Sequence, residues 1–492
     1  MTRGLAGLLT LFILSSSCSR PHPLAEWSPD AFAPETPDRT WSTAWWPEGT
    51  GDSPPVPAAP QPVFDLEYIE APLTLASTLD IALSANPDTR VAWANARAAA
   101  AEFGVSRGDW YPKFAAWANA SYERELEPFG GPNNIIRDDS FMAGPGATMT
   151  WTLLDFGRRE AGDEVTARAL LAANFRFNRE IQDVAFAVQS GYFRLEAAEG
   201  LLEAAEVDFA LASTVMQSLE ERVMLGLATL PELLSARQAE ALAGYEVQVA
   251  RTAIHDARTD LMVTMGIQPG AEIEFTMDSD RPLPREIELG VKRLTMMAMA
   301  TRPDLAAAAA DVQAYEAAVR AAEATLNPQV DFVGSVGYQY TDYTLNPFIN
   351  FTPPDSGSEW NTYWSVGITG SWLLFDGEIR HNEIRKARAE LTASRERMRR
   401  AQLDAAGEVW DSYFDYEAAT LRHEWSLAVE ETAIETLEAV QMAFDTGLQT
   451  LPDLLSAQQS VASARSNRIQ SRADVLIAAA SIVHATGDLK IN

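Results

Sequence analysis

The sequence has few of the residues on which redox and metal chemistry depend. It contains one cysteine and five histidines in 492 residues. One cysteine excludes an internal disulfide framework, and the histidines are too far apart to match a metal-ligand spacing. Neither a nucleophile elbow nor a P-loop is present. We therefore expect no enzyme activity and no cofactor.

Basic residues are scarce relative to acidic ones. The chain has 38 Lys and Arg against 69 Asp and Glu, which gives a formal net charge of −31. This balance argues against nucleic acid as a partner, because phosphate binding needs a basic surface. It also argues against docking on an anionic lipid surface. The acidic side chains are explained most simply as solvated helix faces.

Long apolar runs are absent as well, and a membrane-spanning helix needs about 20 such residues. The run Leu5 to Leu14 follows a basic residue and precedes small serines and Cys18, an order typical of an export signal. A cysteine at the cleavage point resembles a bacterial lipoprotein signal, although Ser15 stands where an aliphatic residue is usual. We expect residues 1–17 to be a signal peptide and Cys18 to be lipidated. An ordinary signal peptide cleaved nearby is the alternative.

Most of the chain is a tandem duplication. Pro112 recurs 216 residues later as Pro328. The segment GLATLPELLSARQ from Gly226 recurs 221 residues later as GLQTLPDLLSAQQ from Gly447. An offset that stays nearly constant over such distances indicates a true internal repeat. We expect a Pro-rich, lipidated strap over 18–70, repeat 1 over 71–270, a linker over 271–289 and repeat 2 over 290–492.

Each repeat is expected to contain the same elements. An Ala-rich helix, about 73–110 and 290–326, stops before a proline. Two strands follow, about 113–125 and 143–155 in repeat 1 and about 329–342 and 362–375 in repeat 2, joined by polar loops. A long helix comes next, about 157–224 and 378–445, and roughly 68 residues would reach about 100 Å. A returning helix, about 231–265 and 452–486, completes each repeat.

The strands alternate between apolar and polar residues. In 329–341, Val330, Phe332 and Val336 share one face, and Asp331 and Ser335 share the other. An apolar face on strands of ten or more residues, with aromatic residues near the strand ends, suits a tilted bilayer crossing. The alternative is a soluble sheet whose apolar face packs on a core.

The two interruptions between the long and returning helices carry the most specific motif. Gly226 and Gly447 permit a turn with positive φ, and a proline follows in the first turn of the next helix. Glu232 and Asp453 place a carboxylate at that helix N-terminus, where the helix dipole stabilises it. The simplest interpretation is a well-capped helical hairpin. Alternatively, two such tips offer a shallow groove to a partner's helical hairpin.

The element order and these motifs resemble the TolC outer-membrane efflux protein family over about residues 70–490. NPD, LLDFG with LFDG, and the repeated tip motif carry the resemblance, and Cys18 makes the chain most similar to the acylated branch. The resemblance implies a mainly α-helical fold with a transmembrane β-barrel, in which three protomers form an α-barrel and a twelve-stranded β-barrel. It implies a homotrimer anchored in outer-membrane lipid and extending into the periplasm. Its partners would be a periplasmic adaptor (membrane fusion) protein and an inner-membrane pump of RND or ABC type.

The resemblance also assigns roles to the tips. The positions that match adaptor-binding residues are Gly226, Leu227, Thr229, Glu232, Gly447, Leu448 and Thr450. Asp453 matches an acidic ring at the periplasmic aperture of some members, and Ser456 stands where a second acid is often found. Such a ring would favour cations at the entrance. For Asp453, helix capping alone is the alternative.

We therefore predict a passive outer-membrane duct of a tripartite efflux system for small toxic compounds or drugs. It would open when the second-repeat hairpin moves outward on adaptor docking. The first alternative is a duct for type I protein secretion, which would have the same fold but a protein as its cargo. A structural coiled-coil lipoprotein is the alternative from another class, and it predicts neither a trimer nor conductance.

Overall fold

The computed structural model describes residues 36, 38, 72–128, 135–269, 273–278, 281–284, 287, 289–347 and 355–488. The predicted signal peptide, Cys18 and almost all of the predicted strap lie outside the described residues. Within the described part of the chain, no helix is long and apolar enough to cross a membrane. The chain divides into two compact units. Unit 1 is Met1–Ala100, Leu170–Ala309 and Arg397–Asn492, and unit 2 is Ala101–Ala169 and Ala310–Glu396.

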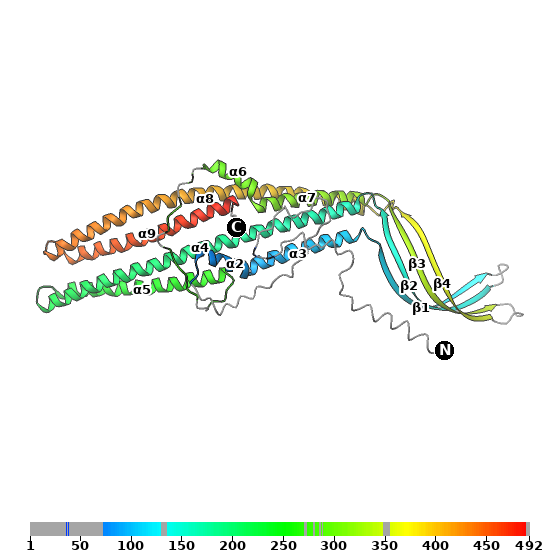
Figure 1. Cartoon of the computed structure of the whole chain (residues 1–492), viewed down its shortest axis with the longest axis horizontal. Coiled ribbons are helices and arrows are strands. Elements are labelled where there is room, and N and C mark those ends of the chain that lie inside the picture. The colour runs from blue at the N-terminus through cyan, green and yellow to red at the C-terminus, as the bar shows by residue number, and fades with distance from the viewer. Residues whose placement is uncertain are drawn as a thin grey trace. The chain divides into compact units, whose positions relative to one another are not determined.

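The elements follow the same order in both repeats (Figure 1). Repeat 1 contains α2 (Leu75–Ala85), α3 (Pro87–Gly108), β1 (Lys113–Pro128), β2 (Ile135–Leu154), α4 (Arg158–Met224) and α5 (Leu230–Thr264). Repeat 2 contains α6 (Val291–Thr301), α7 (Pro303–Ala324), β3 (Gln329–Pro347), β4 (Asp355–Ser371), α8 (Ile379–Asp445) and α9 (Leu451–Thr486). The long helices α4 and α8 begin and end within one residue of their predicted bounds.

The prediction of one continuous Ala-rich helix per repeat is wrong, because each is broken before a proline. Asn86 (φ −61°, ψ 129°) separates α2 from α3, and Arg302 (φ −66°, ψ 124°) separates α6 from α7. Proline lacks an N–H and disfavours helical geometry in the residue before it. Pro87 and Pro303 are therefore the first residues of new helices.

The strands differ from their predicted bounds. β1 continues to Pro128, β2 begins at Ile135, β3 continues to Pro347 and β4 begins at Asp355. Much of the sequence assigned to polar loops is therefore paired strand, because continuous antiparallel hydrogen bonding outweighs the low strand propensity of Asp, Asn and Gly. At its other end β4 stops at Ser371, before the predicted 375. The Trp372 indole there donates to the Leu326 carbonyl at 3.0 Å.

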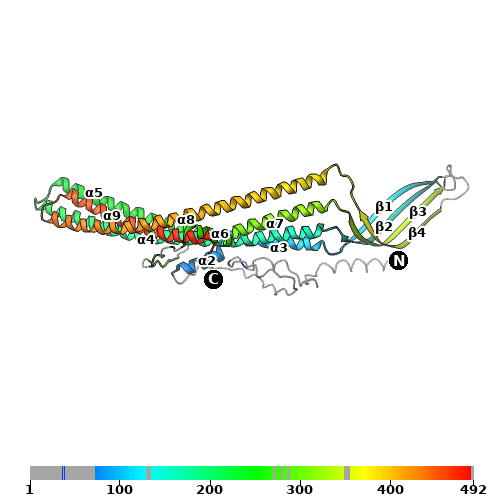
Figure 2. The same cartoon turned by 90° about the horizontal axis from the view of Figure 1, so that it is seen from above.

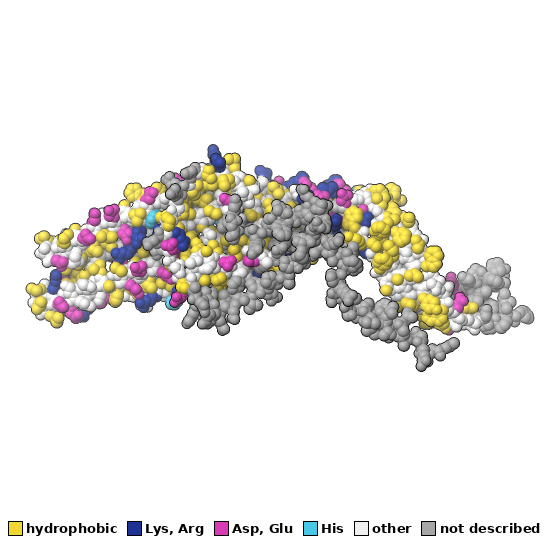
Figure 3. All heavy atoms as spheres, viewed as in Figure 1, with side chains coloured by type: hydrophobic (Ala, Val, Ile, Leu, Met, Phe, Trp, Pro, Cys, Tyr) yellow, Lys and Arg dark blue, Asp and Glu magenta, His cyan; other side chains and the backbone are white. Residues whose placement is uncertain are grey.

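The four strands form one antiparallel sheet in unit 2, in the order β1-β2-β3-β4. Its apolar face is exposed in the single chain. Phe114, Trp364 and Ile368 on that face are 74%, 73% and 68% exposed, and Figure 3 shows hydrophobic side chains gathered over the strands. The opposite face carries residues such as Ser335 and Ser365, whose hydroxyl groups lie 2.7 Å apart. The predicted division into an apolar and a polar face is confirmed.

An aspartate–arginine pair stabilises each strand-to-helix junction of unit 2. Asp155 contacts Arg159 at 2.9 Å and Asp376 contacts Arg380 at 2.6 Å. The hydrogen bond from Arg380 holds the pKa of Asp376 below its usual value. Both arginines also donate to carbonyls at the end of the preceding helical segment, Arg159 to Asp109 and Arg380 to Thr325. The duplicated LLDFG and LFDG motifs are therefore structural.

In unit 1, α4 packs with α5 and α8 packs with α9 as two helical hairpins that run beside each other (Figures 1 and 2). An apolar seam with heptad spacing runs along α4 and is buried. Phe177, Ile181, Val188 and Leu195 have no exposed surface, and they pack with Leu261 of α5. A coiled-coil seam of this kind uses large and small apolar residues at heptad spacing.

Candidate functional site: the hairpin tips

Both hairpin turns of unit 1 use a glycine with positive φ, which only glycine adopts readily. Gly226 has φ 72° and Gly447 has φ 78°. The amide of Leu227 closes one turn on the Arg222 carbonyl at 2.7 Å, and the amide of Leu448 closes the other on Ala443 at 2.8 Å. The turns therefore push both leucines outward, where they are 75% and 81% exposed.

Capping boxes start the two returning helices. Glu232 accepts from the Thr229 amide at 2.7 Å, and Asp453 accepts from the Thr450 amide at 3.0 Å. The threonine hydroxyls bond the same carboxylates. Backbone and side-chain hydrogen bonds from Thr229 lower the pKa of Glu232. Those from the Thr450 hydroxyl and amide lower the pKa of Asp453. The capping interpretation is confirmed for both acids, and an additional role of Asp453 at an aperture stays a prediction.

The two tips differ in their packing, which their near-identical sequences did not indicate. Leu230, the first residue of α5, is 61% exposed, whereas its counterpart Leu451 in α9 is 1% exposed. Leu451 and Leu454 pack in a cluster with Leu219 of α4 and Leu233 of α5. The second-repeat tip is therefore held against the first-repeat hairpin.

An ion pair joins the ends of the two long helices next to the tips. Arg222 of α4 lies 3.5 Å from Asp445 of α8, and its guanidinium lies 5.2 Å from the centre of the Phe444 ring. In the duplication Arg222 corresponds to Ala443, so this contact occurs once per chain. The sequence analysis did not identify it, because its partners are 223 residues apart.

A groove of about 910 Å³ runs between α4, α5 and α9. Ala, Ser and Gln side chains form most of its wall, together with Leu242, Pro452 and Leu455. Ser456 lines this groove, whereas Asp453, which was predicted to lie at the same aperture, is not among its lining residues. The structure therefore places the groove next to the predicted tips of unit 1.

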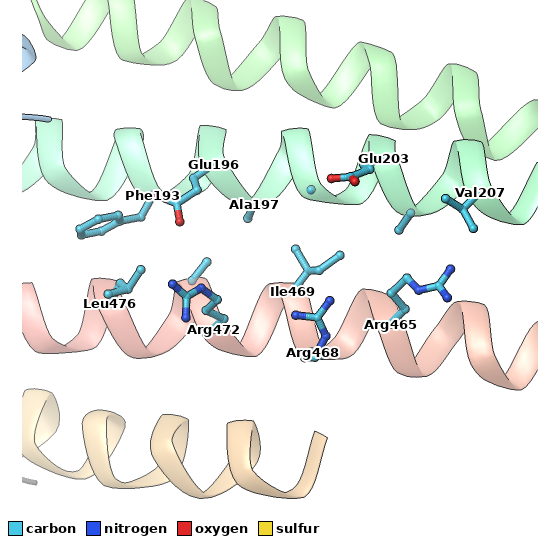
Figure 4. A pocket seen from close by; sticks show the side chains of 13 residues that line it. Phe193, Glu196, Ala197, Glu203, Val207, Arg465, Arg468, Ile469, Arg472 and Leu476 are labelled. Atoms are coloured by element: carbon cyan, nitrogen blue, oxygen red, sulfur yellow. The ribbon is translucent and has the colours of Figure 1, made fainter. Parts of the chain in front are cut away.

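A smaller cavity of about 290 Å³ lies between α4 and α9 (Figure 4). Arg465, Arg468 and Arg472 extend into it from α9, and Glu196 extends from α4. Neighbouring acids neutralise two of the arginines: Arg465 contacts Asp208 at 3.0 Å and Arg468 contacts Glu430 at 2.6 Å. Burial raises the pKa of Glu196 and of Asp208. We interpret this cavity as a buried ionic network that ties the helices together. Among the described residues, no group of three or more His, Cys, Asp or Glu side chains could hold a metal ion.

Comparison with known proteins identifies the family of this chain. The family model described as outer membrane efflux protein matches residues 78–267 and 294–488, so it matches once in each repeat. Protein CyaE of Bordetella pertussis is 28% identical over 423 residues, which cover 85% of this chain and 84% of that protein. The pyoverdine export outer membrane protein OpmQ of Pseudomonas aeruginosa is 23% identical over 430 residues, covering 84% and 85%.

Solved structures show the same fold. The outer-membrane channel OprN has a TM-score of 0.73 at 21% identity and covers 84% of this chain and 89% of its own. The outer membrane protein VceC of Vibrio cholerae has a TM-score of 0.70 at 18% identity, covering 84% and 96%. By their printed names, OprN is an outer-membrane channel and OpmQ is an export outer membrane protein. The two matched repeats, which together span most of the sequence, show that the chain belongs to the outer membrane efflux protein family.

Proposed function

We propose that this chain is the trimeric outer-membrane duct of a tripartite export system. One observation carries the proposal: among the described strands, the sheet of unit 2 leaves its edge strands β1 and β4 each without a partner on the outer side, and its apolar face is exposed. Unpaired edges of long strands invite pairing with another chain. An exposed apolar face of this size marks a contact with lipid or protein.

Closure of three sheets, β4 of one copy against β1 of the next, would satisfy both edges. The twelve strands would then turn their apolar faces to lipid, where every backbone polar group must be paired. The apolar stretch of β1 from Phe114 to Tyr122 covers nine residues. A tilted transmembrane strand needs about 9–11 residues to cross the bilayer. Tyr338 and Trp360, whose rings stack at 4.8 Å, form an aromatic layer on the same face.

The internal repeat supports self-association of unit 1. Within the chain, α9 covers α4 so closely that a Cβ atom on Gly200 would lie 3.3 Å from Ile469. The equivalent surface of α8 is uncovered: Phe414, Leu421 and Trp425 are 50%, 50% and 72% exposed. The α5 helix of a second copy, which is the repeat counterpart of α9, would cover this stripe as α9 covers α4.

We further propose that the tips bind a periplasmic adaptor supplied by an inner-membrane pump. Exposed Leu227 and Leu448 beside a groove of small residues suit a partner's helical hairpin. Opening would separate the Arg222–Asp445 pair and release Leu451 from its cluster. Asp453 and Ser456 would then lie at the aperture, and Cys18 would carry a lipid anchor.

Small compounds are the cargo that we favour. The relative OpmQ is, by its name, a pyoverdine export outer membrane protein. A duct for type I protein secretion has the same architecture and is the second candidate. A structural coiled-coil lipoprotein would leave the apolar face of the sheet without a role.

Three measurements test the proposal. The purified chain should migrate as a heat-dissociable trimer, conduct ions in planar bilayers, and lower the accumulation of drugs or dyes in cells that carry its partner pump. A deletion strain with unchanged accumulation and unchanged protein secretion would contradict both ducts. A monomer without conductance would favour the structural alternative. Loss of acyl labelling in Cys18→Ala would establish the anchor.

A further inference from the structure

A row of four residues crosses the polar face of the sheet at one level. Trp117 of β1 pairs with Gly146 of β2, which pairs with Gly337 of β3, which pairs with Tyr363 of β4. Residues directly opposite in antiparallel strands point to the same face. Two aromatic side chains on the edge strands therefore flank two glycines on the inner strands.

The two rings lie over the glycines. A Cβ atom on Gly146 would come within 2.4 Å of Trp117 Cζ2, and one on Gly337 within 2.5 Å of Tyr363 Cζ. The ring centres are 6.5 Å apart, with 30° between the ring planes. The rings therefore fill the space above the inner strands and form one aromatic surface, which we call the Trp117–Tyr363 surface.

The rows on either side of this surface are small or polar and uncharged. On the helix side lie Ala115, Thr148, Ser335 and Ser365, and on the other side lie Asn119, Gln339 and Asn361. Trp117 and Tyr363 themselves are partly exposed. A compound that moves along the polar face would meet hydrogen-bonding groups, then the rings, then hydrogen-bonding groups again.

The charged residues of the polar face determine whether such a compound should be a cation or an anion. Its described acidic residues are Glu123, Glu125, Asp138, Asp331 and Glu359. Among the described side chains of this face Lys113 is the one base, and it is paired with Asp109 at 2.8 Å. An acidic wall concentrates cations and repels anions.

We propose that the Trp117–Tyr363 surface is a contact site for planar aromatic cations that pass along the duct. The proposal rests on the proposed function, because the polar face becomes the lumen wall only when three sheets close. Aromatic faces attract flat rings by offset stacking and attract cations through their quadrupole. A trimer would present three such surfaces at one level.

The test is block of ionic current by ethidium, a planar aromatic cation, added on the strand side of the full-length trimer in planar bilayers. We expect concentration-dependent block of the wild type. Trp117→Leu with Tyr363→Leu keeps a side chain over each glycine but removes the rings, so the half-blocking concentration should rise about tenfold. Trp117→Phe with Tyr363→Phe should stay within about twofold.

The matched control is Trp364→Leu, which removes an equally large ring from the apolar face next to Tyr363. Its block should equal that of the wild type. A second blocking cation tests the wild-type channel without any substitution. Tetrabutylammonium, a cation without aromatic rings, should block the wild type about tenfold less strongly than ethidium. Equal block by both cations, or an unchanged block in the double Leu variant, would overturn the site. Absence of any wild-type conductance would instead contradict the duct itself.

Discussion

Arg222 at the end of α4 contacts Asp445 at the end of α8 at 3.5 Å, and these two residues join the two hairpins of one chain at their tips. Both side chains are partly exposed, so the pair contributes at most about 1 kcal/mol to stability. A contribution of that size is small for folding, yet it shifts a two-state equilibrium roughly fivefold. The position of the pair therefore suits a latch that an arriving partner releases.

Removal of this latch should favour the open channel. We expect Arg222→Ala to raise the open probability in planar bilayers by up to about fivefold. Arg237→Ala is the matched control, because Arg237 pairs with Glu220 at 2.9 Å within the first hairpin and should leave opening unchanged. Equal effects of the two substitutions would refute the latch.

The buried leucine at the second tip should control how firmly that tip is held. Leu451→Ala removes a side chain that is 1% exposed, so we expect the free energy of local opening to fall by about 2–5 kcal/mol. Hydrogen exchange of the first turns of α9 measures this change. Leu230→Ala, at the exposed counterpart in α5, should change the free energy of local opening by less than about 0.5 kcal/mol. Similar protection in both variants would show that the tips are not packed differently.

The Asp453 cap should make the start of α9 sensitive to acid. Hydrogen bonds from Thr450 lower the pKa of Asp453 in the folded chain. Because the pKa is lowered on folding, the cap stabilises the helix fully when the pH is above the pKa of Asp453 in the unfolded chain, for which 3.8 is the reference. This stabilisation is lost as the pH falls through the pKa of Asp453 in the folded chain. Exchange of the Thr450 amide should accelerate, relative to its intrinsic rate, on acidification below about pH 4. Asp453→Asn should abolish this extra acceleration. A wild-type profile identical to that of Asp453→Asn would show that the carboxylate does not act as a cap in solution.

The glycines beneath the rings should be needed for the sheet. Gly337→Ala would place a methyl group within 2.5 Å of the Tyr363 ring, whereas Gly367→Ala on β4 meets nothing within 4 Å. We expect Gly337→Ala to destabilise the sheet by about 1–3 kcal/mol and to lower the temperature at which the proposed trimer dissociates, as measured by gel electrophoresis. Gly367→Ala should leave that temperature unchanged. An unchanged temperature in both variants would show that the Tyr363 ring does not rest on Gly337.

Several features of the fold were predictable because they depend on local physics. The bounds of α4 and α8 follow from helix propensity that ends at glycine, and the alternation in 329–341 depends on the two-residue period of a strand. The strand ends and the breaks at Asn86 and Arg302 were predicted less well. Polar residues at the end of a strand form backbone hydrogen bonds with a neighbouring strand when one lies beside them. The sequence does not show which segment that neighbouring strand is.

The sequence by itself determined the duplication, the order of elements and the chemistry of the tips, because repeats, periodicity and capping act over short distances along the chain. Tertiary structure alone decided how the two copies differ. Leu230 and Leu451 occupy the same motif, yet one is exposed and the other is buried, because burial depends on which helix packs alongside. The same holds for Arg222 with Asp445 and for Trp117 with Tyr363, which approach only when residues more than 200 positions apart fold together.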